Sequence, residues 1–291
     1  MPHGAVLYWC RSLLVAGVLV LNGAPPVEFA PGIVSTGHEF TVTFSPDGHE
    51  VYFTRSTTNP RGTHIMRSVR GASGWQAAEP VSFSVSGAAD LDPALSPDGS
   101  RLYFVSTRPR PNAAPTAKPD MDIWYADRQG ESWGTPHWIQ SLSSDAQEGS
   151  PTIDRAGTLC FFSDRGQPTH NAIYCAAASN GGWSAPVRLD TTVNAGPSDT
   201  SPFLSPDGNA MLFYSERAGG FGQADLYVTV KRGGAWQPAV NLGAAVNTAS
   251  YEYNPSVSPD GATLYFGRDR RVWSLPIAQL DAHVIRAEMF R

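Results

Sequence analysis

Five acidic side chains recur at one position of a repeated pattern, and carboxylates are suited to proton transfer. Each of them stands nine residues before a glycine. These acids are Glu39, Asp90, Glu148, Asp199 and Glu252. Most glycoside hydrolases use two carboxyl groups, one on either side of the scissile bond. The candidate catalytic carboxylates are therefore Glu39, Glu148 and Asp92, which adds a further acid two residues after the second repeated one.

An arginine follows the second strand-like run of each repeat, in register with the acid. These arginines are Arg55, Arg108, Arg165, Arg217 and, in the last repeat, Arg268 or Arg270. Carboxylates around a narrow axis repel one another, by about 2 kcal/mol for neighbours ~7 Å apart at an effective dielectric of ~20. Matched arginines supply the counter-charge. The sequence therefore predicts a structural ring of ion pairs in which the repeated acids brace the fold.

Residues that differ between the repeats are better candidates for a binding site. Side chains next to the repeated acids vary, and so do those that begin the third strands. They combine polar and aromatic types, which suits a sugar-like or peptide ligand at a channel mouth. The predicted ligand-binding residues are His38, Asp92, Asp122, Gln147, Tyr251 and Tyr253. A solvated rim without a dedicated ligand is the open alternative.

A second catalytic arrangement would pair a histidine base with a tyrosine proton donor. His38 or His170 would be the base, and Tyr251 or Tyr253 the acid. Histidines are also metal ligands, but His38, His64 and His170 stand far apart in the sequence, with no H-x-H or H-E-x-x-H spacing. We therefore predict no metal site and no cofactor.

These residues belong to a repeat of about fifty residues, the period of a propeller or solenoid. Four copies contain the tetrapeptide Ser-Pro-Asp-Gly, and the third has Asp154-Arg155-Ala156-Gly157 instead. This composition favours a type I turn. An apolar run precedes each turn, an aromatic run follows it, and a third strand comes next. A fourth strand is predicted to begin at Trp75, Trp133, Trp183 and Trp236, so each unit has the four strands of a propeller blade.

The fifth unit lacks a fourth strand of its own, because the chain after Pro276 has a helical pattern. At the other end, Pro26–Phe29 resembles Pro186–Leu189 of the third unit. We expect the N-terminal segment to complete the fifth blade and so to remove the open sheet edges. The prediction is an all-β, five-bladed β-propeller of four-stranded antiparallel blades over residues 25–277, closed by an N-terminal strand. A short C-terminal helix, 278–291, should dock through one apolar face that contains Ile277, Leu280, Val284 and Ile285.

The first 24 residues have the pattern of a secretory signal peptide. Arg11 precedes the apolar run Leu13–Leu21, and small residues follow at Gly23 and Ala24. We therefore expect a periplasmic or extracellular protein, with no membrane span in the mature chain. The net charge is −5, and the chain has 19 arginines, two lysines and no basic run, so we expect no nucleic-acid partner. A monomer is favoured over an oligomer.

Cys160 and Cys175 fall on the predicted second and third strands of one blade. An oxidising compartment would permit a disulfide between them. The sequence alone favours two reduced, buried side chains, because free cysteine often behaves as a small hydrophobic residue.

The repeat resembles that of the TolB-like propeller family. The second unit shows the family's string as Asp90, Pro93, Ser96–Gly99, Leu102–Phe104 and Arg108. The fourth unit repeats it from Asp199 to Arg217, and the resemblance extends over about residues 26–276. It implies a propeller, here without the additional N-terminal α/β domain of TolB. Family members include periplasmic partners of envelope lipoproteins, extracellular binding modules and propellers fused to hydrolases.

The sequence therefore favours an exported binding module that presents a polar and aromatic channel-mouth pocket to a protein, peptide or glycan. No nucleophile–base pair is recognisable in it. The alternative is a carbohydrate-active enzyme, either a glycoside hydrolase or a polysaccharide lyase, that uses the carboxylates or the histidine and tyrosine pairs named above.

Overall fold

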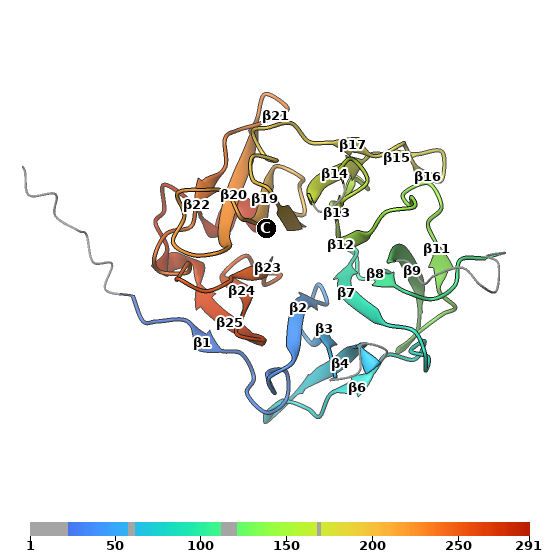
Figure 1. Ribbon diagram of the computed structural model, residues 1–291. Coiled ribbons are helices and arrows are strands. Elements are labelled where there is room, and N and C mark those ends of the chain that lie inside the picture. Colours follow the sequence, from blue (N-terminus) through green and yellow to red (C-terminus); the bar gives the residue numbers. More distant parts are fainter. Residues whose placement is uncertain (1–22, 58–61, 112–120, 168–169) are drawn as a thin grey trace, which may run out of the picture.

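The computed structural model describes residues 23–57, 62–111, 121–167 and 170–291. Five antiparallel sheets surround a central axis in chain order (Figure 1). The predicted five-bladed, all-β propeller with four-stranded blades is confirmed. The predicted signal peptide lies outside the described residues except for its last two positions.

Each blade runs from an innermost strand at the axis to a short outermost strand. Blade 1 consists of β2 (Glu39–Phe44), β3 (Glu50–Arg55), β4 (His64–Gly71) and β6 (Glu79–Pro80). Blade 2 consists of β7 (Asp90–Leu95), β8 (Arg101–Ser106), β9 (Asp122–Gln129) and β11 (His137–Trp138). Blade 3 consists of β12 (Glu148–Ile153), β13 (Leu159–Ser163), β14 (Ala172–Ala176) and β17 (Val187–Arg188). Blade 4 consists of β18 (Asp199–Leu204), β19 (Ala210–Ser215), β20 (Asp225–Arg232) and β22 (Val240–Asn241).

Blade 5 is assembled from both ends of the chain, as the sequence predicts. It consists of β23 (Tyr253–Val257), β24 (Thr263–Arg268), β25 (Arg271–Pro276) and the N-terminal β1 (Val27–Glu28). Antiparallel pairing places Val27 opposite Ser274. Arg271 also forms an ion pair with Glu28 at 2.6 Å. The ring is therefore closed by non-covalent contacts between β1 and β25.

The Ser-Pro-Asp-Gly turns have the predicted geometry. In the first, the Gly48 N–H donates to the Ser45 carbonyl at 2.8 Å, and Ser45 Oγ donates to Asp47 Oδ1 at 2.5 Å. The glycine has a φ of 71°, a left-handed value that side-chain-bearing residues rarely adopt. The motif therefore fixes the hairpin between the two inner strands.

The predicted start of the fourth strands is confirmed. The tryptophans lie in short strands that pair antiparallel with the third strand, at β5 (Gly74–Trp75), β10 (Ser132–Trp133) and β21 (Ala235–Trp236), and the outermost strands named above continue this pairing after a break. In blade 3, β16 (Gly182–Trp183) pairs with β15 (Ala178–Ser179). The rings of Trp133 and Trp183 also pack edge-on against Tyr52 and Tyr103 of the preceding blades. These tryptophans therefore begin the fourth strand, and two of them also join neighbouring blades.

The C-terminal segment is not the continuous helix that was predicted. It contains two 3-10 turns, Ile277–Gln279 and Ala287–Phe290. Its apolar residues still dock, since Ile277, Leu280 and Ile285 are at most 5% exposed. Among the described residues, no helix is long and apolar enough to cross a membrane.

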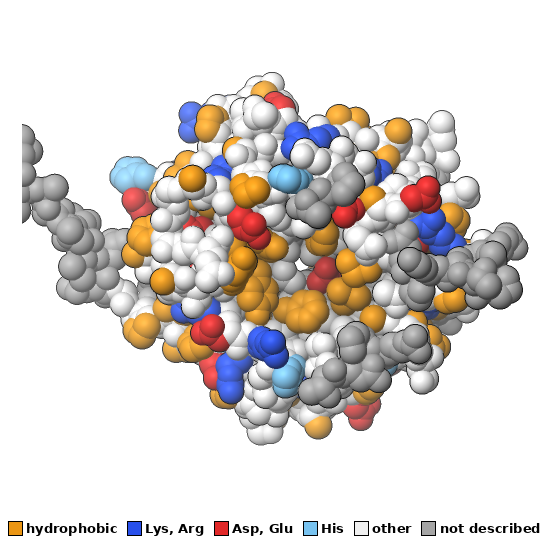
Figure 2. Space-filling view, in the orientation of Figure 1, with side chains coloured by type: hydrophobic (Ala, Val, Ile, Leu, Met, Phe, Trp, Pro, Cys, Tyr) orange, Lys and Arg blue, Asp and Glu red, His pale blue; other side chains and the backbone are white. Residues whose placement is uncertain are grey.

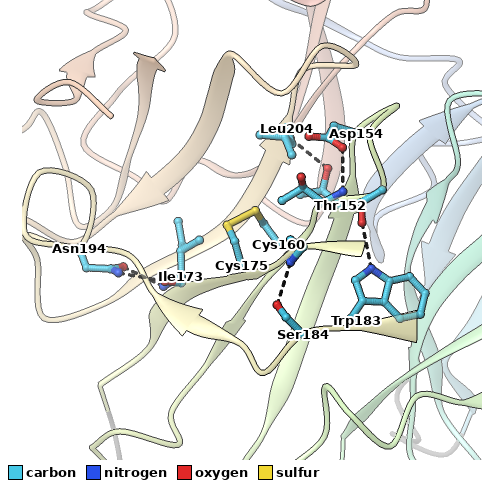
Figure 3. Close-up of a disulfide and its surroundings, with 12 residues drawn as sticks. Thr152, Asp154, Cys160, Ile173, Cys175, Trp183, Ser184, Asn194 and Leu204 are labelled. Atoms are coloured by element: carbon cyan, nitrogen blue, oxygen red, sulfur yellow. Dashed lines mark hydrogen bonds between the residues drawn. A yellow bond between two sulfur atoms is a disulfide. The ribbon is translucent and has the colours of Figure 1, made fainter. Parts of the chain in front are cut away.

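Cys160 and Cys175 form a disulfide between β13 and β14 (Figure 3). The expectation of two reduced cysteines was therefore wrong. The two residues are direct cross-strand partners with their Cα atoms 4.0 Å apart, a register that the sequence pattern could not fix. The bond joins the two middle strands of blade 3.

Each repeated acid begins or directly precedes an innermost strand and is paired with the arginine of its own repeat. All five acids are completely buried. The acid–arginine distances are 2.7 Å for Glu39–Arg55 and 2.8 Å for Asp90–Arg108, Glu148–Arg165, Asp199–Arg217 and Glu252–Arg268. Arg270, the alternative in the last repeat, does not take this place. Four of the acids, Glu39, Glu148, Asp199 and Glu252, also accept hydrogen bonds from the connector that enters their blade. Asp90 instead accepts one from Ser106 of its own second strand.

The arginines bind the same connectors through backbone carbonyls. Arg55 donates to Ile33, Arg165 to Leu142, Arg217 to Val193 and Arg268 to Val246. All five guanidinium groups also lie 5.1–5.3 Å from the centre of a phenylalanine ring on their own second strand. Acid, arginine and connector thus form one clamp that joins successive blades.

The first test removes one arginine of this clamp. Arg217→Met leaves the Asp199 carboxylate buried without its counter-charge, so we expect the free energy of unfolding to fall by about 3–5 kcal/mol. Urea denaturation at pH 7 measures the change. Adding Asp199→Asn to the variant should recover part of the loss.

Arg271→Met is the matched control, because its pair with Glu28 is partly exposed, at 43% and 24%. It should cost less than about 1 kcal/mol. Equal losses in the two variants would show that burial does not decide the strength of the clamp.

The second test removes the disulfide. The bond closes a loop with a sequence separation of 15 residues. The double variant Cys160→Ala/Cys175→Ala should therefore be less stable by about 3 kcal/mol, mainly through the entropy of the unfolded chain. Urea denaturation with and without a reductant checks this: the reductant should destabilise the natural protein and leave the double variant unchanged.

Candidate functional site

One residue of each blade's innermost segment has a positive φ, and the five form a polar ring across the channel. The φ values are 48° for Thr41, 52° for Asp92, 47° for Ser150, 50° for Ser201 and 48° for Asn254. A shift in strand register marks the same place in every blade. Left-handed backbone at non-glycine residues is unfavourable, so surrounding contacts must hold it.

Hydrogen bonds between neighbouring blades close this polar ring. Thr41 Oγ1 donates to Asp92 Oδ1 at 2.8 Å, and Ser150 Oγ donates to Asp92 Oδ2 at 2.9 Å. Ser201 Oγ donates to Asn254 Oδ1 at 2.6 Å, and Asn254 Nδ2 donates to Thr41 Oγ1. The hydroxyls of Ser150 and Ser201 lie 3.3 Å apart. Every member therefore contacts both of its neighbours.

The hydrogen count of the ring depends on the protonation of Asp92. When Asp92 is ionised, the Ser150 hydroxyl donates to Asp92 and the Ser201 hydroxyl donates to Asn254. Neither hydroxyl then has a hydrogen left for the contact between them. A proton on Asp92 Oδ2 would reverse the donor at Ser150, so that all five contacts would hold one hydrogen each. Burial raises the pKa of Asp92, against the opposing effect of the hydrogen bonds from Thr41 and Ser150. The carboxyl is only 5% exposed, which removes it from direct reach of a substrate.

Two glycines make room for aromatic rings next to the polar ring. A Cβ atom on Gly149 would lie 2.1 Å from Phe162 Cε1, and one on Gly267 would lie 2.1 Å from Tyr253 Cε2. The Tyr253 hydroxyl accepts a hydrogen bond from the Arg270 N–H at 3.0 Å. Figure 2 shows one face of the molecule, which is hollowed at its centre and has hydrophobic side chains around the hollow.

Phe221 and Tyr251 expose their aromatic rings on two loops that are bonded to each other. They are 52% and 42% exposed. The two loops are joined by an isolated bridge between Ala224 and Tyr251. Asp225 accepts hydrogen bonds from the backbone N–H groups of Phe221, at 2.6 Å, and Gly222, at 3.1 Å. The loop that carries Phe221 is therefore held in place without a ligand.

Blade 5 lacks the long loop that the other blades carry between their second and third strands. Arg268 pairs directly with Arg271, so only Asp269 and Arg270 form the turn. Both have positive φ values, 51° and 59°. The Arg270 carbonyl accepts from the Glu39 N–H, which places this short turn beside His38. Blade 5 therefore has the shortest connection between its second and third strands.

The predicted catalytic carboxylates Glu39 and Glu148 are buried in the clamps. Burial raises the pKa of Glu148, and the bonds from Ser144 and Arg165 only partly offset this. For Glu39, hydrogen bonds from Thr36 and Arg55 outweigh the effect of burial and lower its pKa. Both side chains are 0% exposed.

The other predicted site residues lie in several environments. His38 and His170 are exposed on blades 1 and 3, and Gln147 is half-buried, with its backbone N–H bonded to Asp164. Asp122 is buried and paired with Arg110 at 2.7 Å. Among the described residues, no three His, Cys, Asp or Glu side chains are gathered as metal ligands would be.

Sequence reasoning missed Asp225 and Arg110 as partners within this region. The contact of Asp225 with the loop of Phe221 could have been suspected from the glycines at 219, 220 and 222. Arg110 lies in a proline-containing loop with no repeated counterpart, so no periodic signal marked it.

The third test concerns Asp92. Because its folded pKa lies above the ordinary 3.8, its contribution to stability is fully present below pH 3.8 and is lost as the pH rises through the folded pKa. Asparagine supplies the missing N–H donor at every pH, but its amide nitrogen cannot accept the Ser150 backbone N–H, which donates to Asp92 Oδ2 at 3.0 Å. Asp92→Asn therefore removes the titration without reproducing every contact, and the stability that the natural protein gains on protonation of Asp92 should be missing from the variant.

Urea denaturation of both proteins between pH 4 and 8 measures the difference in their free energies of unfolding, which should move in favour of the natural protein toward acid pH. Comparing the two curves isolates Asp92 from other titrating groups. A difference that does not change with pH would contradict the raised pKa of Asp92.

Comparisons with known proteins identify solved structures with a similar fold. No family model matches the chain, and no curated protein matches it. Among solved structures, TolB from Acinetobacter baumannii is 20% identical, with a TM-score of 0.51 over 82% of this chain and 54% of that one. A structure assigned to TolB from Agrobacterium tumefaciens is 19% identical, with a TM-score of 0.51 over 78% and 69%.

A gluconolactonase from Xanthomonas campestris is 14% identical, with a TM-score of 0.52 over 84% of this chain and 73% of that one. This chain thus spans about half of the Acinetobacter protein and about two thirds of the Agrobacterium one. The resemblance predicted from the repeats is confirmed for the fold: the chain is a five-bladed β-propeller, and TolB propellers are among the structures it resembles.

Proposed function

We propose that the protein is an exported binding module whose channel mouth receives a protein or peptide segment. One observation carries this proposal: Phe221 and Tyr251 are exposed aromatic rings on loops that are already ordered by hydrogen bonds. Rigid aromatic side chains are the residues that most often anchor protein interfaces. Because these rings are already ordered, the protein would lose little conformational entropy when a ligand binds to them.

The short turn of blade 5 supports an extended ligand. A segment could leave the channel over this two-residue turn at Asp269 and Arg270, which lies beside His38. A glycan is less well supported. Its hydroxyls need free polar side chains, whereas Asp122 is already paired with Arg110.

The enzyme alternative has weaker support. A hydrolase that uses Glu39 and Glu148 would need substrate to reach side chains that are 0% exposed and engaged by arginines. A lyase would need His38 or His170 beside a tyrosine, and no described hydrogen bond joins such a pair. Export remains part of the proposal and rests on the signal-peptide pattern of residues 1–24.

The fourth test is a selection for ligands. Peptides selected from a random phage-displayed library on the folded protein should bind at the aromatic pair. Phe221→Ala and Tyr251→Ala should each weaken a selected peptide by about 10- to 30-fold, as measured by isothermal titration calorimetry.

Val240→Ala is the matched control, because Val240 is 49% exposed on the outermost strand of the same blade as Phe221. It should leave the affinity unchanged. If the selected peptides bind equally well to all three variants, the binding site lies elsewhere on the protein. Turnover of a polysaccharide panel by the natural protein would favour the enzyme alternative.

A further inference from the structure

A groove runs along the seam between blade 5 and blade 1, on the side of the Ser-Pro-Asp-Gly turns. β24 of blade 5 and β2 of blade 1 lie side by side at this seam (Figure 1). The groove has a volume of about 920 Å³, within the range of sites for small ligands. Its walls are the turns of both blades, β24 and the hairpin of blade 1 that contains β5. It is separate from the channel mouth, because the repeated acids and the turns lie at opposite ends of the innermost strands.

The floor of the groove is aromatic. Where blades 1 and 2 meet, the Trp133 ring packs directly against Tyr52, with 5.8 Å between the ring centres. At the seam of blades 5 and 1 the equivalent rings are Trp75 and Tyr265, and Phe44 contacts both of them, at 6.2 Å and 4.7 Å. The residue directly before the turn is aliphatic in the other four blades. All three rings line the groove and are half-buried, so they give it an apolar surface that is open on one side.

One cation in the groove lacks the ion pair that its counterpart in blade 2 forms. Arg128 of blade 2 pairs with Glu50 of the preceding blade at 2.6 Å. Arg70 holds the same register on blade 1. Thr263 of blade 5 stands two residues after the turn glycine, where blade 1 has Glu50. The exposed guanidinium of Arg70 therefore has no ion pair among the described residues.

Two carboxylates line the same groove. Asp47 and Asp260 belong to the turns of blades 1 and 5, and both are exposed. Their Oδ1 atoms accept the hydrogen bonds within the turns, and no described residue donates to their Oδ2 atoms. In blades 2 and 4 the residue after the turn, Ser100 or Asn209, donates to the Oδ2 of its own turn's aspartate. The groove therefore has a free donor group and two free acceptor atoms.

These opposite charges favour a neutral ligand. Burial raises the pKa of Tyr265 to about 12, Asp260 adds to this rise and Arg70 opposes it, so both charges lie near this ring. Arg70 would attract an anion, which the two carboxylates would repel, and a cation would meet the reverse. A ligand with hydroxyl groups avoids both penalties, because a hydroxyl can donate to a carboxylate and accept from a guanidinium.

We propose that this groove binds a neutral oligosaccharide of two or three sugar rings. The C–H face of one ring would lie on the aromatic floor, and its hydroxyls would bond Arg70 and the two aspartates. The site goes beyond the proposed function, because it lies away from the channel mouth and needs no peptide.

Trisaccharides of matched size and different charge are the probes. N-acetylchitotriose, cellotriose and maltotriose are neutral, the deacetylated chitotriose is cationic at slightly acid pH, and trigalacturonate is anionic. Titration of the full protein, followed by the backbone amide resonances of residues that line the groove, measures the affinities. At least one neutral probe should bind at millimolar concentration, and about 5-fold more tightly than either charged probe.

Arg70→Met should weaken the neutral probe about 10-fold, because a hydrogen bond to a charged group is lost. Lys231→Met is the matched control. Lys231 holds the same register on blade 4 and lies over Trp236 at 4.6 Å, but it does not line the groove. Equal losses in the two variants, or no loss in Arg70→Met, would overturn the site.

Two further outcomes decide the ligand class. Tighter binding of a charged trisaccharide would overturn the neutral ligand, and absence of binding by all three neutral probes at about 10 mM would overturn the proposal. Phe221→Ala should leave binding of the sugar unchanged. Failure of the proposed peptide site at the mouth is therefore distinguishable from failure of this groove.

Discussion

A buried carboxylate at the start of each innermost strand is the constraint on which the propeller depends. Removing such a charge from water is unfavourable unless a counter-charge and hydrogen bonds replace the solvent. Each acid obtains the counter-charge from an arginine of its own blade, and four of the five obtain hydrogen bonds from the connector that enters the blade, as Glu252 does from Arg268 and Thr248. The buried charge is therefore tolerated only when consecutive blades are correctly docked.

The same constraint explains the left-handed residues two positions after the acids. The ion pair of the acid fixes one end of the innermost strand, and the Ser-Pro-Asp-Gly turn fixes the other end. The strand has one extra residue between these ends, which the shift in register accommodates. The extra residue projects into the polar ring, where its hydrogen bonds to neighbouring blades offset the backbone strain. Because the polar ring spans the channel, it also separates the mouth from the half that faces the Ser-Pro-Asp-Gly turns, where Phe44, Leu95, Ile153 and Phe203 line the walls.

The periodic features of the fold could be predicted from the sequence because each is repeated. Five acids, five arginines and four intact turns define the blade count, and Pro26–Phe29 identifies the closing strand. Features without a periodic signal were missed. The contacts that Trp133 and Trp183 make with the preceding blade are not reported by a pattern along one chain, and the C-terminal residues dock without the helix that their spacing suggested.

For the same reason, the candidate site could be predicted only in part from the sequence. Its non-repeated members could be identified by comparing equivalent positions, which singled out Asp92, Tyr251 and Tyr253. Their environments could not be predicted. Asp92 looked like an unpaired carboxylate but is a buried member of the polar ring, because all five blades contribute the same position to one small space. Phe221 needed Asp225 to become a rigid feature, and that contact is visible only in three dimensions.

The departures from symmetry gather in blade 5. This blade has the two-residue turn, the exposed Tyr251 and the unpaired Ser256, and it is the one that β1 completes. A ligand that binds only the folded protein stabilises it by its own binding free energy. A ligand held against Tyr251 would therefore contact the blade whose assembly joins the two ends of the chain. Binding at the mouth and closure of the ring would thus be linked through blade 5.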